Sequence, residues 1–204
     1  ACFSRLHFAE HMPALRQCHL IIEAIVEQFD VKKTLFSELD LIVNKEAIIA
    51  SNTSSFSITA LASSIENPSR FIGLHFFNPA PVMQLVEIIP AIQTNPNITS
   101  RCIEIIQSWG KTTVLCKDSP GFIVNRIARP YYSEAIRIFE EGIANIETID
   151  FAMTDTYGFK MGPFALMDFI GHDVNFNVTK SVWESCYFED RYKPSITQRN
   201  LLYA

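Results

Sequence analysis

The chain has 204 residues, of which 48% are hydrophobic and 19% are charged. This length and composition suit a globular protein that buries its own core, and they exclude a disordered chain. The formal net charge of −5, without a basic stripe in the sequence, gives no electrostatic reason to expect a nucleic acid or an anionic membrane as partner.

The lengths of the apolar runs and the spacing of the cysteines argue against further classes of protein. No apolar run approaches the roughly 18 residues that a membrane-spanning helix needs, and residues 1–20 lack the core of a signal peptide. The cysteines are widely spaced without a CxxC pair, so neither a disulfide framework nor a metal site is expected. We interpret each as a small buried apolar side chain in a reducing compartment. The five residues are Cys2, Cys18, Cys102, Cys116 and Cys186.

Short runs rich in Ile and Val alternate with stretches of helical period from residue 19 onward, which is typical of βαβ units. The sequence therefore predicts a mostly parallel sheet. Oxygens in residues 52–55 are candidates to cap the second predicted helix, and Gly110 is expected to end the third. Strands are predicted at 19–25, 47–51, 70–76, 85–90 and 112–116, and helices at about 29–43, 58–65 and 97–110.

The hydrophobic pattern of the sequence changes after residue 118: the segments that follow have helical period and almost no β-rich runs. A domain boundary is predicted there, which separates an α/β domain at 1–118 from an all-α domain at 119–204. Pro130 lies inside the first of the later helical segments and is expected to kink or divide it.

The segment GLHFFNPAPVMQLVEII at 73–89 carries the most chemical information. His75 closes a predicted strand, and strand ends at the carboxyl edge of an α/β sheet face the ligand crevice. Glu87 follows in the next strand, beyond a turn that prolines make rigid. A lone histidine is more often structural, but a carboxylate on one ring nitrogen fixes the tautomer and stabilises the protonated form, as a general base requires.

Three segments, SNTSS (51–55), GLHFFNPAPVMQLVE (73–87) and DSPGFIVNR (118–126), resemble the 3-hydroxyacyl-CoA dehydrogenase family in order and spacing. The similarity covers nearly the whole chain. It implies that 1–118 is the C-terminal part of a Rossmann-like NAD-binding domain, and that 119–204 is an incomplete helical domain for substrate binding and dimerisation.

The resemblance implies four catalytic residues. His75 is expected to take the proton from the 3-hydroxyl of a (3S)-3-hydroxyacyl-CoA while hydride passes to NAD, with Glu87 as its partner carboxylate. Ser54 and Asn125 are expected to hydrogen-bond the substrate near the reacting carbon. Taken singly, Ser54 and Asn125 could be only helix caps, and Glu87 could be only a strand carboxylate that reaches solvent.

The resemblance also assigns the cofactor site, without any metal. In EAIVEQFDVK (23–32), Glu27 and Lys32 match family positions that line the NAD site, and Ser54 and Asn78 match further positions near the cofactor. The alternative is that Glu27 has only a structural role, as a solvent-exposed residue at the start of a helix, where the helix dipole favours a carboxylate.

The sequence contains no glycine-rich phosphate-binding turn before Gly73, the first glycine of the chain. We therefore expect that the family's GxGxxG segment lies outside these 204 residues, whether by truncation or because residues precede Ala1. The C-terminal ITQRNLLYA also stops where the family continues. By itself this fragment is expected to bind NAD poorly and to turn over little substrate.

Two further segments, ARPYYSEAIR (128–137) and GHDVNFNVTKSVW (171–183), resemble the bacterial phenylacetate-degradation branch, which oxidises 3-hydroxyadipyl-CoA. A 3-hydroxybutyryl-CoA or general β-oxidation enzyme is the competing assignment. By charge alone, Arg126, Arg129 and Lys160 could face a dicarboxylic acyl chain. The resemblance implies a cytoplasmic homodimer, joined through the helical domain. The rival of another class is a non-catalytic, crystallin-like relative.

Overall fold

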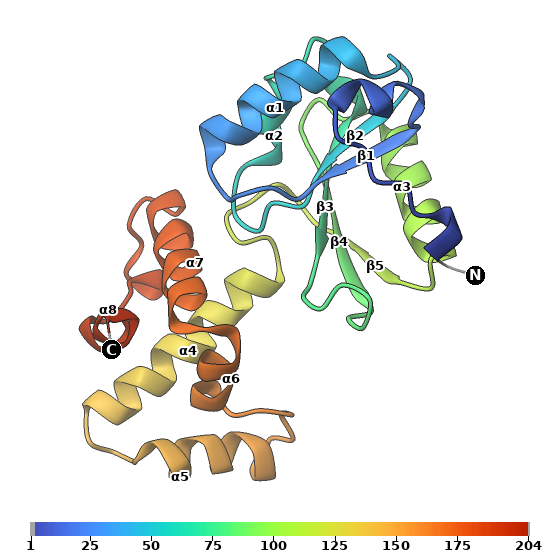
Figure 1. Ribbon diagram of the computed structural model, residues 1–204. Helices are drawn as coiled ribbons and strands as arrows, with labels where there is room; N and C mark the ends of the chain where they lie inside the picture. The colour runs from blue at the N-terminus through green and yellow to red at the C-terminus, as the bar shows by residue number, and fades with distance from the viewer. Residues whose placement is uncertain (1–2, 204) are drawn as a thin grey trace. The chain divides into compact units, whose positions relative to one another are not determined.

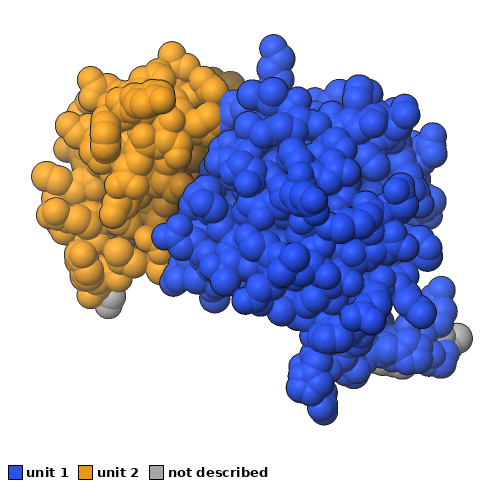
Figure 2. All heavy atoms as spheres, turned by 90° about the horizontal axis from the view of Figure 1, so that it is seen from above, with its two compact units in different colours: residues 1–119 blue, residues 120–204 orange. Residues whose placement is uncertain are grey.

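A computed structural model describes residues 3–203 of the chain (Figure 1). The chain divides into two compact units, Ala1–Ser119 and Pro120–Ala204, which Figure 2 distinguishes by colour. This division lies next to residue 118, where the hydrophobic pattern of the sequence changes. The first unit contains the five strands, and the second is helical, as the sequence predicted.

The first unit is built on a five-stranded sheet in the order β1-β2-β3-β4-β5. Neighbouring strands are parallel except β3 and β4, which form an antiparallel hairpin around residues 77–84. The predicted mostly parallel sheet is therefore confirmed, and no helix separates its third and fourth strands. The strands are β1 Leu20–Glu23, β2 Ile48–Ser51, β3 Phe71–Phe76, β4 Leu85–Pro90 and β5 Thr112–Leu115.

Helices cover both faces of this sheet, with α1 and α2 on one side and α3 on the other (Figure 1). Cys102 and Ile106 of α3 pack into a buried cluster with apolar residues of β2, β3 and β4. On the opposite face, Gly73 allows a close approach, because a Cβ there would lie 2.8 Å from Ile58 of α2. The helical segments are η1 Phe3–Arg5, η2 Met12–Gln17, α1 Phe29–Ile42, α2 Ile58–Ala62, η3 Pro68–Arg70 and α3 Pro96–Ser108.

The predicted cap of α2 was wrong by a few residues. The side chain of Ser57, outside the predicted 52–55 segment, accepts the Ala60 amide hydrogen. The carboxylate of Asp118 accepts the amide hydrogens of Ile58 and Thr59 at 3.0 and 2.8 Å. Residues 52–55 make other hydrogen bonds, described below, which sequence spacing alone does not reveal.

A buried ion pair stabilises the unit near the C-terminal end of α1. Arg70 binds the Asp40 carboxylate, and its guanidinium also donates to the carbonyl oxygens of Asn44 and Ala47. Burial raises the pKa of Asp40, but the Glu66 amide and Arg70 outweigh burial and hold that pKa below its ordinary value. This pair lies away from the carboxyl ends of the strands and serves as a control in an experiment below.

The second unit has a core from α4, α5 and α6, centred on Tyr132, Ile136, Phe164 and Met167. Helix α4 runs through Pro130 without dividing, so of the two expectations for this proline, division is wrong. No helix of the described residues is long and apolar enough to cross a membrane. The helical segments are α4 Val124–Glu140, α5 Ile146–Phe151, the π-helix η4 Ala152–Thr156, α6 Pro163–Ile170, α7 His172–Ser185, η5 Asp190–Tyr192 and α8 Ile196–Tyr203.

Gly162 is a position where a methyl group should cost stability. Asp150 accepts the amide hydrogens of Phe164 and Ala165 at 2.9 and 2.8 Å and thereby caps α6, and a Cβ on Gly162 would overlap its side chain. We expect Gly162→Ala to lower the free energy of unfolding by about 1–3 kcal/mol, measured by thermal or urea unfolding. In an Asp150→Gly background, which removes every overlapping side-chain atom including Cβ, the same change should cost little. An equal cost in both backgrounds would refute the steric account.

Candidate active site

The central feature of the candidate site is a histidine paired with a glutamate across the β3–β4 hairpin. His75 and Glu87 are direct partners in the antiparallel register, so their side chains project from the same face of the sheet. Nδ1 of His75 lies 2.7 Å from Oε2 of Glu87, and the two side chains are 7% and 0% exposed. Since a carboxylate can only accept, this contact favours the tautomer with the hydrogen on Nδ1, in which Nε2 is the basic nitrogen.

The carboxyl ends of three parallel strands bring further polar groups to the same edge of the sheet. Glu23 ends β1, Ser51 ends β2, and His75 is the penultimate residue of β3. Directly after β2, Asn52 accepts the Phe76 amide hydrogen through Oδ1 at 2.8 Å, which ties this turn to the strand of the histidine. In open α/β sheets this edge is where ligands bind.

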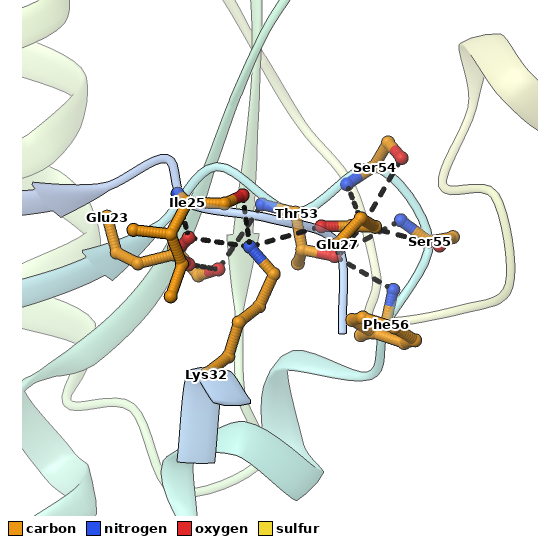
Figure 3. A network of polar contacts seen from close by, with 9 residues as sticks. Glu23, Ile25, Glu27, Lys32, Thr53, Ser54, Ser55 and Phe56 are labelled. Atoms are coloured by element: carbon orange, nitrogen blue, oxygen red, sulfur yellow. Dashed lines mark hydrogen bonds and ion pairs between the residues drawn. The ribbon is translucent and has the colours of Figure 1, made fainter. Parts of the chain in front are cut away.

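Glu27 organises the turn that contains Ser54 (Figure 3). Its Oε1 accepts from the Thr53 hydroxyl at 2.5 Å, from the Ser54 amide at 2.9 Å and from the Ser54 hydroxyl at 3.3 Å. Burial raises the pKa of Glu27, but the Thr53 hydroxyl, the charge of Lys32 and the Ser54 amide together lower it below its ordinary value. A charged Glu27 therefore holds the turn by several acceptor contacts.

Lys32 is more deeply buried than expected for a residue that lines an open binding site. Its ammonium group is 1% exposed and lies between two carboxylates, 2.6 Å from Glu23 and 3.1 Å from Glu27. Figure 3 shows this enclosure. Glu27 precedes the N-cap Gln28 of α1, and its side chain is 37% exposed. A direct contact between Lys32 and a cofactor remains a prediction, whereas its contact with Glu27 is part of the fold.

Asn78 lies in the loop between β3 and β4 and is exposed, next to a cis peptide bond with Pro79. Lys111, which the sequence analysis did not single out, clamps this loop from the start of β5. Its Nζ donates to the carbonyl oxygens of Ala80 at 2.6 Å and Met83 at 2.8 Å. The loop that follows the histidine is therefore held by a residue more than twenty positions later in the chain.

Asn125 and the three candidate cations belong to the second unit. Asn125 lies in the first turn of α4, whose N-cap is Ile123, so Asn125 is not the cap residue. Arg129 is 4% exposed and donates to the carbonyl oxygens of Asn125 and Asn175 and to a threonine hydroxyl. Burial lowers the pKa of Arg129 to about 10. Arg126 donates to the Tyr192 hydroxyl, and Lys160 is exposed.

Beside Lys111, sequence reasoning missed Glu23, Ser51 and Thr53, all of which are buried. A signal for Glu23 was present, because it is an acidic residue at the end of an otherwise apolar strand. For Ser51 and Thr53 no comparable signal exists, since small hydroxyl residues are common after strands.

A cavity of about 710 Å³ lies elsewhere in the first unit, beside β5 and the start of α2. Burial, together with the charges of Glu87 and Asp118, raises the pKa of Cys116 in its wall to about 12, which keeps the thiol protonated. Cys2 lies outside the described residues. No group of three or more acidic, histidine or cysteine side chains suited to a metal ion occurs within 3–203. The cavity is lined by Ser57, Thr59, Pro90, Ala91, Ile92, Leu115, Cys116, Lys117 and Asp118.

The polar groups at the sheet edge fit a dinucleotide. Glu27 is half-buried and ionised, and a carboxylate at this edge suits the hydroxyls of a ribose. Ser54 and Asn78 add hydroxyl and amide groups near the same strand ends. The pair of His75 and Glu87 supplies a base in their neighbourhood, so the arrangement can accept a proton from a hydroxyl substrate.

Comparisons with known proteins identify two segments. Residues 1–119 match the family model for the NAD binding domain of 3-hydroxyacyl-CoA dehydrogenase, and residues 121–204 match the model for its C-terminal domain. The chain is 50% identical over 189 residues to 3-hydroxyadipyl-CoA dehydrogenase of Escherichia coli K12, covering 93% of this chain and 40% of that protein.

Other relatives carry related names. A probable 3-hydroxybutyryl-CoA dehydrogenase of Deinococcus radiodurans is 42% identical over 98% of this chain and 72% of its own length. The crystal structure of a 3-hydroxybutyryl-CoA dehydrogenase from Escherichia coli K12 superposes with a TM-score of 0.93 at 49% identity, covering 96% of this chain and 41% of that chain. The chain thus spans about two fifths of the length of these two Escherichia coli relatives.

Proposed function

The chain belongs to the 3-hydroxyacyl-CoA dehydrogenase family, and from that premise we propose that it supplies the acid–base half of an NAD-dependent oxidation of a (3S)-3-hydroxyacyl-CoA. The product is the 3-ketoacyl-CoA. The observation that carries this proposal is the 2.7 Å contact between Nδ1 of His75 and Oε2 of Glu87 at the carboxyl edge of the sheet.

Mechanism follows from the chemistry of this pair. NAD, held by Glu27 and Asn78, would supply the acceptor for the hydride of C3 of the substrate. Nε2 of His75 takes the proton of the 3-hydroxyl, so that one hydride and one proton leave and the carbonyl forms. Glu87, next to Nδ1, stabilises the resulting imidazolium. In the reverse direction the same imidazolium returns the proton to the 3-keto oxygen.

The remaining predicted site residues take supporting roles in this proposal. Ser54, held by Glu27, and Asn125, at the start of α4, hydrogen-bond the substrate near C3. Glu27 and Asn78 bind the ribose and nicotinamide portion of the cofactor, with Lys32 behind Glu27. Each of these groups orients the reactants, and orientation alone contributes substantially to rate.

The proposed substrates are inferred from the names of the similar proteins. We propose 3-hydroxyadipyl-CoA or 3-hydroxybutyryl-CoA, the acyl groups in the names of the proteins most similar to this chain in the comparisons reported above. Among the candidate cations, Arg129 is buried and already makes three hydrogen bonds inside the second unit. Arg126, with one hydrogen bond to Tyr192, and the exposed Lys160 therefore suit a substrate carboxylate better. A cytoplasmic bacterial enzyme that pairs through its helical domain is part of the same proposal.

The proposal is tested by NADH formation. The full-length protein is mixed with NAD and with (3S)-3-hydroxyadipyl-CoA or (3S)-3-hydroxybutyryl-CoA, and the (3R) isomers serve as controls. We expect NADH to form with at least one (3S) substrate and with neither (3R) isomer. No NADH with any 3-hydroxyacyl-CoA would refute the dehydrogenase proposal and favour a non-catalytic, crystallin-like role. Light scattering on the same sample determines whether the protein is a dimer.

A further inference from the structure

A second carboxylate lies beneath the cofactor-facing residues and plays no part in the mechanism described so far. The side chain of Glu23 is 0% exposed, and its Oε1 accepts from Nζ of Lys32 at 2.6 Å and from the Ile25 amide at 2.7 Å. Lys32 and Glu27 complete a row of three charges, which Figure 3 shows. Glu23 is therefore the buried end of a row whose other end reaches the candidate site.

The order of these charges makes Glu23 the buried counter-charge of Lys32. A buried ammonium group is stable only with a counter-charge and hydrogen bonds, and Glu27 alone, with a side chain 37% exposed, offers partial neutralisation. Glu23 supplies the enclosed counter-charge. With Lys32 fixed in this way, its remaining contact of 3.1 Å directs the Glu27 carboxylate toward the turn that contains Ser54.

A second route leads from Glu23 to the same turn without passing through Lys32. The Ser51 hydroxyl donates to Oε2 of Glu23 at 2.7 Å and accepts the Thr53 amide hydrogen at 3.2 Å. The Thr53 hydroxyl in turn donates to Glu27. Both oxygens of Glu23 are thus engaged, one by each route, and both routes end at residues 53–55.

We propose that Glu23 is a positioning residue for the turn at 53–55, acting through Lys32 and Glu27 on one route and through Ser51 on the other. It makes no contact with Ser54, and among the residues predicted for the cofactor site it contacts Lys32. Its consequence for catalysis rests on the proposed function, because it depends on Ser54 and Glu27 facing the reactants.

The first test compares two substitutions that each neutralise a buried acid in the same unit. Glu23→Gln keeps the shape of the side chain and removes its charge. Asp40→Asn does the same in the ion pair with Arg70, away from the site. We expect both variants to melt at lower temperature, but only Glu23→Gln to lower kcat/KM of the full-length protein, by about 10–100-fold, because a misplaced turn spoils orientation.

A double variant separates positioning from general destabilisation. If Glu23 acts largely through Lys32, then Glu23→Gln combined with Lys32→Met should be little worse in kcat/KM than Lys32→Met alone. Losses that multiply would overturn the route through Lys32, and Ser51→Ala would then have to reproduce the effect of Glu23→Gln for the proposal to stand. Equal losses of kcat/KM in Glu23→Gln and Asp40→Asn would overturn it altogether.

The second test does not depend on activity. Amide hydrogen exchange of Thr53 and Ser54, measured by NMR, should be at least about tenfold faster in Glu23→Gln than in the wild type, and unchanged in Asp40→Asn. Unchanged exchange at both amides in Glu23→Gln would refute the positioning role even in an active enzyme. Faster exchange in a protein that never forms NADH would uphold the positioning role and refute the dehydrogenase proposal.

Discussion

Replacing His75 by glutamine should lower kcat of the full-length protein by about 10²–10⁴-fold, the usual contribution of a positioned general base. Glutamine approximates the size of the imidazole but cannot accept the proton of the 3-hydroxyl at neutral pH. KM for the substrate should change far less, because the proton is transferred only as the reaction proceeds. Steady-state kinetics with NADH absorbance as readout measures both parameters.

His172 offers a matched control for this substitution. Its Nε2 lies 2.9 Å from the Asp168 carboxylate, so it too is a histidine paired with an acid, but on helices of the second unit. His172→Gln should retain kcat within about threefold. If His75→Gln turned over at the wild-type rate, or if both variants lost activity equally, His75 would not be the base.

Replacing Glu87 by glutamine should also lower kcat strongly, by about 10²–10⁴-fold, although this residue need not touch the substrate. The amide of glutamine can donate a hydrogen to Nδ1 of His75, which would place the ring proton on Nε2 and block the basic nitrogen. The buried site would also lose the charge that stabilises the imidazolium. The same kinetic assay measures the loss.

Thermal unfolding of Glu87→Gln must accompany the kinetics, since Glu87 is fully buried. Asp40→Asn, which neutralises another buried acid, shows how much activity is lost through stability alone. A Glu87→Gln protein that is folded and retains more than a third of the wild-type kcat would contradict the paired-base mechanism.

The strands were predictable from sequence because their signal is local. Runs such as IIAS and FIGLHF are apolar on both faces, as strands covered by helices must be, and the structure places β2 and β3 there. The pairing of His75 with Glu87 also follows from local facts, namely two strands joined by a short proline-containing loop. Antiparallel register then places the two residues opposite each other.

Side-chain partners were less predictable because they are chosen in three dimensions. The hydroxyls of residues 53–55 were interpreted as cap candidates, but the Glu27 carboxylate, 26 or more positions earlier in the sequence, uses them instead. Spacing gave no indication that Asp118 would cap α2 from the end of the unit. Lys32 was predicted to be a site residue, but its enclosure by two acids depends on how α1 meets β1.

Nitrogen NMR of labelled histidine tests the central claim most directly, because it reports which ring nitrogen of His75 carries the hydrogen. We expect the neutral ring to be protonated at Nδ1, in a strong hydrogen bond with Glu87, with Nε2 as the bare acceptor. A neutral ring protonated at Nε2 would contradict the account, because that nitrogen could then not accept the proton of the substrate.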